Sequence, residues 1–487
     1  MPLETLDLDK ITTLEEALLV IRELVKEVVI LRADNAQLRA ENTELRSDNI
    51  KLKERIAKLE KNSSNSSKPP SSDITKPESE QRQAGKRKIG AQLGHKANFR
   101  RKFSPEEIDH REKIKPLDNC PECRTKLEPS QEVRIHQQAE LVDKPVIITE
   151  YQLLGSHCPC CKKTVYPDLP QGVIPGQLLG PKVLSLFGYM KAAMGVSISV
   201  LAEFSKDVLK LDICRGAIQK AIFRVSEALK PAYEELAAII PEQQALNVDE
   251  TGWKQNGSRH WVWIFCNTSI AFFVISKHRS CQVIEDVLGK NFLGTLTSDF
   301  YSAYVKYASP FQQYCLAHLI RELKFLTTLP DSVSKKFGIR LLAYMKRLFK
   351  LWHSRNSFTP EDWKKKTERF KRDLQRYVFS HSFEKKSDAR RIQRRFIKHW
   401  ASLFRFLDSP ELYEPTNNFA ERTLRHLVRL RRISFGSRGK NGSDWTQRAA
   451  SIIATCKLQK KSAWEFFQHA VFAKACGGLA PSLIARA

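Results

Sequence analysis

Three acidic residues, far apart in the chain, have the local setting of metal ligands. Asp249 follows the apolar run ALNV, Asp299 follows FLGTLTS, and Glu421 lies near the start of a helical pattern. Carboxylate oxygens are the ligands that magnesium and manganese ions prefer. Two such ions ~3.5–4 Å apart promote phosphoryl transfer by holding the attacking and leaving oxygens in line. The three carboxylates are therefore candidates for a two-metal phosphoryl-transfer site.

Taken alone, this set of three acids is a weak signal. The chain has 54 acidic residues, so many other sets of three exist. Acids at strand ends often only form turns, and Glu421 can serve merely as a helix-capping residue. The interpretation therefore depends on elements that bring the three side chains together.

The segment that begins at Ala245 has the pattern of such elements. ALNVD predicts a first strand, and TGWKQ and RHWVWIFCN flank Asn256-Gly257, a pair that favours a type I′ hairpin turn. Further strands are predicted for IAFFVIS, FLGTLTSD and QQYCLAH, and a short helix for SCQVIEDVLGK. This is the order of a ribonuclease-H-like α/β fold with a mixed sheet. Its first strand is central and its fourth lies beside it, which would bring Asp249 and Asp299 together.

The third acid needs a helix that packs across this sheet. Residues from about 319 to 412, rich in Lys, Arg and aromatic residues at helical spacing, predict a long helical insertion. TNNFAERTLRHLVRLRR then predicts the helix that carries Glu421. Thr416, Asn417 or Asn418 can cap it, and Glu421 stands three residues after Asn418, as in a capping box.

Composition narrows the class of protein. Among 487 residues, 81 are Lys or Arg and 54 are Asp or Glu, a net charge of +27 that indicates a polyanionic partner, most simply nucleic acid. The N-terminus lacks a signal-peptide pattern. The most apolar stretch, 183–201, contains Lys191, which costs ~2.5–3.5 kcal/mol in a membrane, so we expect no membrane partner. Eleven scattered cysteines favour a reducing cytoplasm over a secreted disulfide framework.

The first sixty residues have a heptad repeat. Leucines recur every seven residues at position d: Leu24, Leu31, Leu38, Leu45, Leu52 and Leu59. Position a carries Ile21, Val28, Asn35, Asn42, Asn49 and Ile56, a pattern that favours a two-stranded parallel coiled coil. In a homodimer all five facing flank pairs have opposite charge: Glu27–Arg32, Asp34–Arg39, Glu41–Arg46, Asp48–Lys53 and Arg55–Glu60. Self-association is predicted, and a helix packed within its own chain is the alternative.

Two cysteine pairs predict a zinc site. Cys120 and Cys123 form one CxxC motif, and Cys158 and Cys161 form another. Such pairs together bind zinc tetrahedrally, and a closed site of four thiolates is structural. The apolar run VIITEYQLL between them predicts strands, and the whole suits a zinc ribbon. His157 and Cys160 are spare ligands, and buried free thiols are the alternative.

The remaining segments predict a linker and a helical region. The stretch KNSSNSSKPPSSD is too polar to pack, and the basic residues 85–102 can contact phosphates or form a solvated tether. Residues 196–225 are compatible with a helix-turn-helix whose second helix starts near Arg215, although a plain helical bundle fits equally.

Several collinear motifs resemble the insertion sequence 66 family of DDE transposases. They are NSSKPPSSD at 65–73, GAQLGHK at 90–96, the two CxxC motifs, VDETGW at 248–253, SDFYSAY at 298–304, CLAHLIREL at 315–323, and TNNFAERTLR at 416–425 followed by FGSRGKNG. The resemblance extends in order from the coiled coil to about residue 470. The basic stretch departs from the usual family signature at Ala91 and Leu93.

The resemblance implies a DNA transposase of the bacterial cytoplasm or nucleoid. Its catalytic acids would be Asp249, Asp299 and Glu421, with two Mg²⁺ or Mn²⁺ ions per active site. Asp249 and Asp299 would share both ions, and Glu421 would hold one of them. The substrates would be the DNA ends of the element, cut by hydrolysis, and the target DNA to which the 3′ hydroxyl is joined. Helper proteins are possible further partners.

Neighbouring residues have weaker assignments. Five arginines near Glu421 could grip DNA phosphates or form a solvated face: Arg422, Arg425, Arg429, Arg431 and Arg432. Cys315 and His318 could ligate metal, but such a pair more often packs and orients its neighbours. Trp253, Trp261 and Trp263 alternate along strands and are expected in the core rather than stacked on bases.

Two rival functions share parts of this pattern. A non-enzymatic DNA-binding regulator would use the coiled coil, zinc ribbon and helix-turn-helix, and a nuclease would use the metal site but not join strands. The predicted regions are a coiled coil at 1–60, a basic Ser/Pro-rich linker at 61–110, a zinc ribbon at 111–175, a helical region at 176–243, and a catalytic domain at 244–475.

Overall fold

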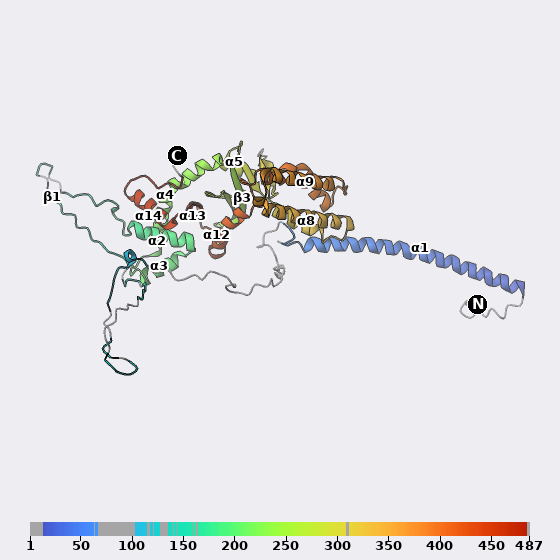
Figure 1. Ribbon diagram of the computed structural model, residues 1–487, viewed down its shortest axis with the longest axis horizontal. Helices are drawn as coiled ribbons and strands as arrows, with labels where there is room; N and C mark the ends of the chain where they lie inside the picture. Colours follow the sequence, from blue (N-terminus) through green and yellow to red (C-terminus); the bar gives the residue numbers. More distant parts are fainter. Residues whose placement is uncertain are drawn as a thin grey trace. The chain divides into compact units, whose positions relative to one another are not determined.

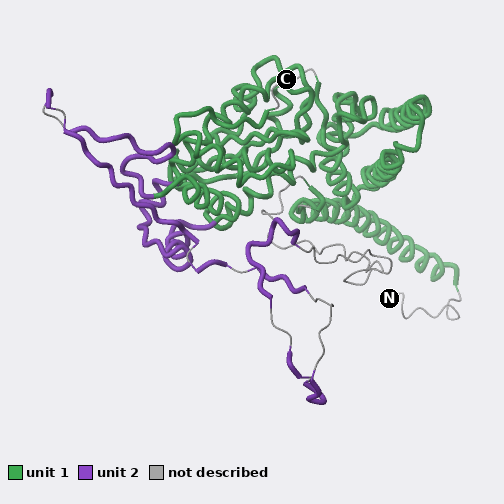
Figure 2. The backbone as a smooth tube through the Cα atoms, turned by 60° about the vertical axis from the view of Figure 1, so that its left-hand side comes forward, with its two compact units in different colours: residues 1–77, 179–195, 222–487 green, residues 78–178, 196–221 purple. Residues whose placement is uncertain are grey.

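The computed structural model describes most of the chain. The described residues are 13–62, 64–66, 103–113, 117–119, 121–126, 135–139, 141–143, 145–157, 159–161, 164–307 and 311–484. The chain divides into two compact units (Figure 2), one of residues 1–77, 179–195 and 222–487, the other of residues 78–178 and 196–221. Most of the predicted linker, residues 67–102, lies outside the described residues.

A five-stranded mixed sheet forms the centre of the first unit. Its strands are β3 (Ala245–Gln255), β4 (Ser258–Cys266), β5 (Ala271–Ser276), β6 (Thr295–Ser298) and β7 (Gln312–Tyr314). Their order is β5-β4-β3-β6-β7. β4 lies antiparallel to both β3 and β5, whereas β6 lies parallel to both β3 and β7. The first strand is central and the fourth lies beside it, as the sequence predicts.

The first hairpin explains one error in the predicted strands. Asn256 and Gly257 have φ values of 49° and 75°, which confirms the predicted type I′ turn. Pairing of β3 with β4 continues without interruption to Gln255 and Ser258. Asp249 therefore lies inside β3, and the prediction that it ends a strand is wrong. Its acidic and glycine neighbours suggest a break, but the cross-strand ladder carries the strand through them.

Helices cover both faces of the sheet. On one face, Ile264 and Phe273 pack in a common core with Leu424 of α12 (Asn418–Ser434) and Ala450 of α13 (Lys440–Leu458). On the opposite face, Trp263 packs edge-on against Tyr304 of α6 (Ser302–Tyr307). There Phe272 also stacks on Tyr233 of α4 (Arg215–Ile239). The alternation of strand side chains thus assigns neighbouring residues to different helical layers. Figure 1 shows α12 beside β3.

Side chains of α13 accept hydrogen bonds from backbone N–H groups along β5, the strand at one edge of the sheet. Gln447, Ser451 and Thr455, spaced one helical turn apart, accept hydrogen bonds from the backbone N–H groups of Ile275, Phe273 and Ala271 in β5, at 2.9–3.0 Å. A free strand edge is a template for pairing with another chain. The helix therefore blocks β5 from such pairing.

The predicted insertion is helical. It consists of α7 (Leu316–Leu326), α8 (Ser332–His353), α9 (Pro360–Phe379), α10 (Asp388–Lys398) and α11 (Trp400–Phe404). These helices share a core that includes the fully buried Phe337, Phe370 and Phe396. In sequence, these helices lie between β7 and the helix that carries Glu421.

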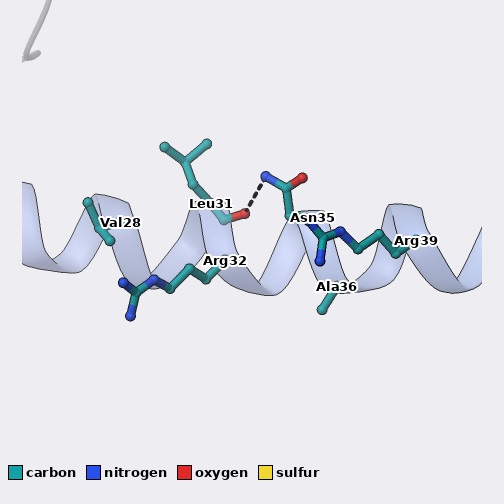
Figure 3. A pocket seen from close by; sticks show the side chains of 6 residues that line it. All are labelled: Val28, Leu31, Arg32, Asn35, Ala36 and Arg39. Carbon is teal, nitrogen blue, oxygen red and sulfur yellow. Dashed lines mark hydrogen bonds between the residues drawn. The ribbon is translucent and has the colours of Figure 1, made fainter.

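The heptad segment forms one long helix, α1 (Leu14–Leu59). Near its end, Ala57 is buried in the core of the insertion, and the Lys61 ammonium lies 3.7 Å from the centre of the Phe325 ring. By contrast, the six leucines at position d are 40–76% exposed on the single chain. Figure 3 shows Leu31 and Asn35 projecting from the same side of α1, with the Asn35 amide donating to the Leu31 carbonyl at 3.2 Å. Pairing with a second chain stays a prediction.

The remaining elements of the first unit complete its helical layers. α2 (Pro181–Tyr189) continues into a π-helical turn at Met190–Met194, α5 (Cys281–Leu288) lies between β5 and β6 in the chain, and α14 (Ala463–Ala475) follows α13. α2 contacts α14. Among the described residues, no helix is long and apolar enough to cross a membrane.

The second unit holds the cysteine motifs and part of the helical region. A bridge between Asn119 and Lys126 flanks the first motif, and β1 (Ser156–His157) pairs with β2 (Thr164–Val165) around the second. The strands predicted in VIITEYQLL are wrong, because residues 145–155 form none and Ile147 is 91% exposed, without a sheet neighbour.

Two helices lie where the helix-turn-helix pattern predicts them. α3 (Ile198–Asp207) is followed by a turn, and α4 begins at Arg215. The first part of α4, to Ala221, belongs to the second unit and its remainder to the first. Whether these helices bind DNA stays a prediction.

Candidate active site

Asp249 and Asp299 occupy equivalent positions on neighbouring parallel strands. Asn247 of β3 pairs with Thr297 of β6. Two residues further along each strand direction stand Asp249, within β3, and Asp299, directly after the last residue of β6. Residues two apart in a strand share a face. The strand register therefore brings these two carboxylates to one site.

Helix α12 brings Glu421 toward them through Asn417. The buried Asn417 amide donates to the backbone carbonyl of Val248 at 2.7 Å and accepts from Asn247 at 3.0 Å. These bonds fasten the start of α12 to β3 next to Asp249. The N-cap residue is Asn417 and not Asn418, so the capping box predicted for Asn418 and Glu421 is absent. The Asn417 side chain makes no capping bond either. The side chain instead serves the long-range contact.

Burial and neighbouring negative charges disfavour the ionised forms of Asp249 and Asp299. The pKa of Asp249 lies well above its usual range because the group is buried and the charges of Glu250, Asp299 and Glu421 oppose its ionisation. Burial and the charge of Glu250 raise the pKa of Asp299 to about 6, although the Tyr301 N–H and two arginines counteract them. The three predicted acids thus lie in one region of concentrated negative charge.

His318 and Cys315 line the same region. The His318 Nε2 atom lies 4.0 Å from the Glu421 carboxylate. Burial and the charge of Arg321 lower the pKa of His318 to about 3, so the imidazole is neutral at pH 7. The Cys315 sulfur accepts the backbone N–H of Asn417 at 3.1 Å. The pair therefore packs and orients its neighbours, the role that the sequence favours.

A fourth acid, Glu250, escaped the sequence reasoning. Its side chain is only 3% exposed, and both Nε and Nη2 of Arg279 donate to its Oε1, at 2.9 and 2.5 Å. The Tyr304 hydroxyl donates to its other oxygen. Strand alternation places Glu250 opposite Trp263, on the face away from α12. The acidic pair Asp249-Glu250 was visible in the sequence, but its remote partner Arg279 was not.

The five arginines of α12 are in different environments. Arg422, Arg425, Arg429 and Arg432 are exposed. Arg429 donates to the carbonyl of Ala193, and the half-buried Arg431 donates to the Thr251 hydroxyl and the Gly252 carbonyl. Arg431 therefore braces α12 against β3, next to Asp249. DNA binding by these arginines stays a prediction.

The carboxylates of the acidic region have the oxygen ligands that divalent cations prefer. Within the described residues, no group of three or more His, Cys, Asp or Glu side chains is arranged to hold a metal ion. Of the four predicted zinc ligands, Cys123 and Cys161 are exposed, and Cys120 and Cys158 lie outside the described residues.

Comparison with known proteins adds the family. A model described as Transposase IS66 family matches residues 176–444, and a model of a family of unknown function (DUF6444) matches residues 7–101. No curated protein matches the chain. The first match spans the sheet, the helical insertion and all three predicted acids. Because it covers more than half of the 487 residues, the chain belongs to the IS66 family of transposases.

Proposed function

We propose that this transposase cuts DNA at the ends of its element and joins the freed 3′ hydroxyl to target DNA, using a ribonuclease-H-like DDE catalytic domain. One observation carries the proposal: the paired register of β3 and β6 brings Asp299 toward Asp249, and the Asn417–Val248 bond brings the start of α12, with Glu421, toward them. Burial and the charges of Glu250, Asp299 and Glu421 accordingly raise the pKa of Asp249. Among the described residues, Glu250 is the one acid of these four that forms an ion pair with a group charged at pH 7, namely Arg279. His318, beside Glu421, is neutral at that pH. The excess negative charge favours bound cations.

Asp249, Asp299 and Glu421 would hold two Mg²⁺ or Mn²⁺ ions. Bound at this site, such ions lower the pKa of water and neutralise charge that develops on the phosphate. Magnesium commonly takes only one or two protein carboxylates and completes its ligand set with water and substrate phosphates. This accounts for carboxylates that are close but not yet arranged as ligands, because the DNA itself would complete the site.

The chemistry needs no further cofactor. In the first reaction water attacks a phosphodiester at the element's end, and the bond to the 3′ oxygen breaks, leaving a free 3′ hydroxyl. In the second reaction that hydroxyl forms a bond to a target phosphorus while one target P–O bond breaks. Exposed arginines of α12 would hold the phosphates in place, and Arg431 and Asn417 would keep Glu421 in position.

The N-terminal parts of the chain supply assembly in this proposal. The coiled coil would join two chains, and a zinc ion held by Cys120, Cys123, Cys158 and Cys161 would stabilise a ribbon-like fold. Metal analysis of the purified protein should find about one zinc per chain. The double substitution Cys120→Ser with Cys123→Ser should remove it, and unchanged zinc content would refute this ligand set.

Strand transfer by the purified protein tests the function. Labelled duplexes that carry the element's ends, with Mg²⁺ or Mn²⁺, should yield joined products. Asp249→Asn should lose them at least a hundredfold yet still bind the duplex, because the substitution removes a cation ligand but little surface. The matched control is Asp286→Asn on the exposed side of α5, which should transfer strands normally.

The outcomes separate the rival functions. Binding without cleavage by the wild type would favour a DNA-binding regulator. Cleavage without joined product would indicate a nuclease. Normal strand transfer by Asp249→Asn would show that Asp249 is not a catalytic residue.

A further inference from the structure

The helical insertion contains a basic pocket that the catalytic proposal does not use. It has a volume of about 380 Å³ and is lined by the end of the α9–α10 connection and one side of α10, including Lys385, Lys386, Arg391, Arg394, Arg395 and Lys398. Asp388 is the single acid among its lining residues, and its carboxylate pairs with Arg391 at 3.2 Å. The pocket therefore carries a concentrated positive charge.

Two of these cations are held in place, and the others point to solvent. Arg391 and Arg395 both donate to the carboxylate of Glu322 in α7. Lys385, Lys386, Arg394 and Lys398 are exposed, and none of them makes an ion pair with an acid in the part of the chain that the structure describes. The first pair anchors α10, and the four exposed cations are available to a ligand.

The pocket adjoins the acidic site. The Arg395 guanidinium lies 4.5 Å from the centre of the ring of Phe300, the residue directly after Asp299 in the chain. Its charge offsets a small part of the rise in the pKa of Asp299. His399, which also lines the pocket, contacts both Phe300 and Tyr314. Glu322 lies one helical turn from His318, the residue near Glu421. Phosphates bound in the pocket would therefore lie beside the three acids.

We propose that this pocket binds the phosphate backbone of the DNA strand next to the phosphodiester that is cut. The inference rests on the proposed function, because it takes DNA as the substrate. The N-terminus of α10 adds the positive end of its dipole to the four exposed cations. Because basic groups flank the acidic ones, their attraction for the strand offsets the repulsion between its scissile phosphate and the acids.

Removal of the exposed cations tests the proposal. The variant carries Lys385→Gln, Lys386→Gln, Arg394→Gln and Lys398→Gln, and it leaves Arg391 and Arg395 on Glu322. Its affinity for a fluorescein-labelled element-end duplex should fall at least tenfold, and the slope of log K against log salt should become smaller by roughly 3.6, since each of the four phosphate contacts contributes about 0.9. Strand transfer should fall in parallel.

A matched variant controls for loss of charge alone. Lys364→Gln, Lys365→Gln, Arg369→Gln and Arg372→Gln remove the same charge from exposed positions of α9. This control should keep most of its affinity. The proposal would be overturned if the pocket variant kept the affinity of the wild type for the duplex, or if the two variants lost the same amount of affinity.

Footprinting of the unmodified protein gives an independent readout. In the DNA complex, Lys385, Lys386 and Lys398 should be protected from acetylation, whereas Lys364 and Lys365 should stay reactive. Reactive pocket lysines in the complex would refute the proposal even if strand transfer proceeds. A wild type that binds DNA but forms no joined product would instead refute the proposed function and leave the pocket testable by binding alone.

Discussion

Asp299 shows that a single acidic residue of this site can lower the stability of the folded protein. Its carboxylate is ionised at neutral pH, although burial and Glu250 raise its pKa to about 6. Buried carboxylates without neutralising partners destabilise the folded state. The site thus stores electrostatic repulsion that bound cations would relieve.

A stability measurement follows from this pKa. The folded state binds a proton on Asp299 near pH 6, whereas the unfolded state binds it only near pH 4. Above pH 6 the ionised group therefore costs the folded, metal-free protein on the order of 3 kcal/mol, and the cost fades as pH falls toward 4. Asp299→Asn should raise the melting temperature at pH 7.5, and by roughly half as much at pH 5.

Thermal denaturation in the presence of a chelator provides the measurement. Asp286→Asn, on the surface, should change the melting temperature little at either pH. A stabilisation by Asp299→Asn that is absent, or that is equal at both pH values, would contradict the assigned environment of Asp299.

Glu250 shows what residue-level reasoning from sequence cannot reach. Its position next to Asp249 assigns it to the opposite face of β3, yet its charge raises the pKa of both Asp249 and Asp299. Only the structure shows that Arg279, also in contact with the Trp261 and Tyr301 rings, holds this carboxylate. Trp253 and Trp263 are buried as expected, whereas Trp261 is only half-buried and contacts Arg259 and Arg279.

At the scale of elements, the joint between α12 and β3 determines where Glu421 lies. Asn417 makes the central contact of this joint, with Val248 and Asn247. At the other end of α12, the backbone at Gly436 lies directly against Lys254 of β3. A Cβ atom at this position would lie 2.1 Å from the Lys254 carbonyl oxygen, so only glycine fits. The helix is thus attached to the same strand at both of its ends.

Asn417→Ala should loosen this joint. It leaves the buried Val248 carbonyl without its donor, which costs about 1–3 kcal/mol of folding free energy. Displacement of Glu421 should lower the strand-transfer rate by roughly 10- to 100-fold. The matched control Asn418→Ala, at an exposed neighbouring position, should leave both quantities nearly unchanged. Equal rates for the two variants would refute the positioning role of Asn417.

Local signals predicted some elements and misled for others. The Asn-Gly turn, the short helix of SCQVIEDVLGK and the order of the strands follow from short-range chemistry and were predictable. VIITEYQLL has the composition of strands but forms no strand within the described residues 145–155. The predicted capping box is absent because Asn417 is the N-cap residue, which puts Ala420 rather than Glu421 three residues after the cap. The first error depends on a sheet partner and the second on the residue at which the helix begins.

At the scale of the whole molecule, α1 presents an apolar seam that a single chain does not cover. Its d-position leucines are exposed, and its flanks are complementary in charge in a parallel pair. Leu31→Lys with Leu38→Lys should abolish pairing through charge repulsion at the seam. Light scattering should show the mass of a dimer for the wild type and of a monomer for this variant.

Substitution on the outer face gives the control. Ala33→Lys with Ala40→Lys adds the same charge at the outward position f and should leave the dimer intact. An unchanged mass for the leucine variant would rule out the coiled coil as the site of self-association.

The location of bound cations tests the central claim most directly. In crystals of the protein with element-end DNA and Mn²⁺, anomalous scattering should reveal two manganese ions whose protein ligands are the carboxylates of Asp249, Asp299 and Glu421. Crystals without manganese at these side chains, or with manganese held by other residues, would contradict the account.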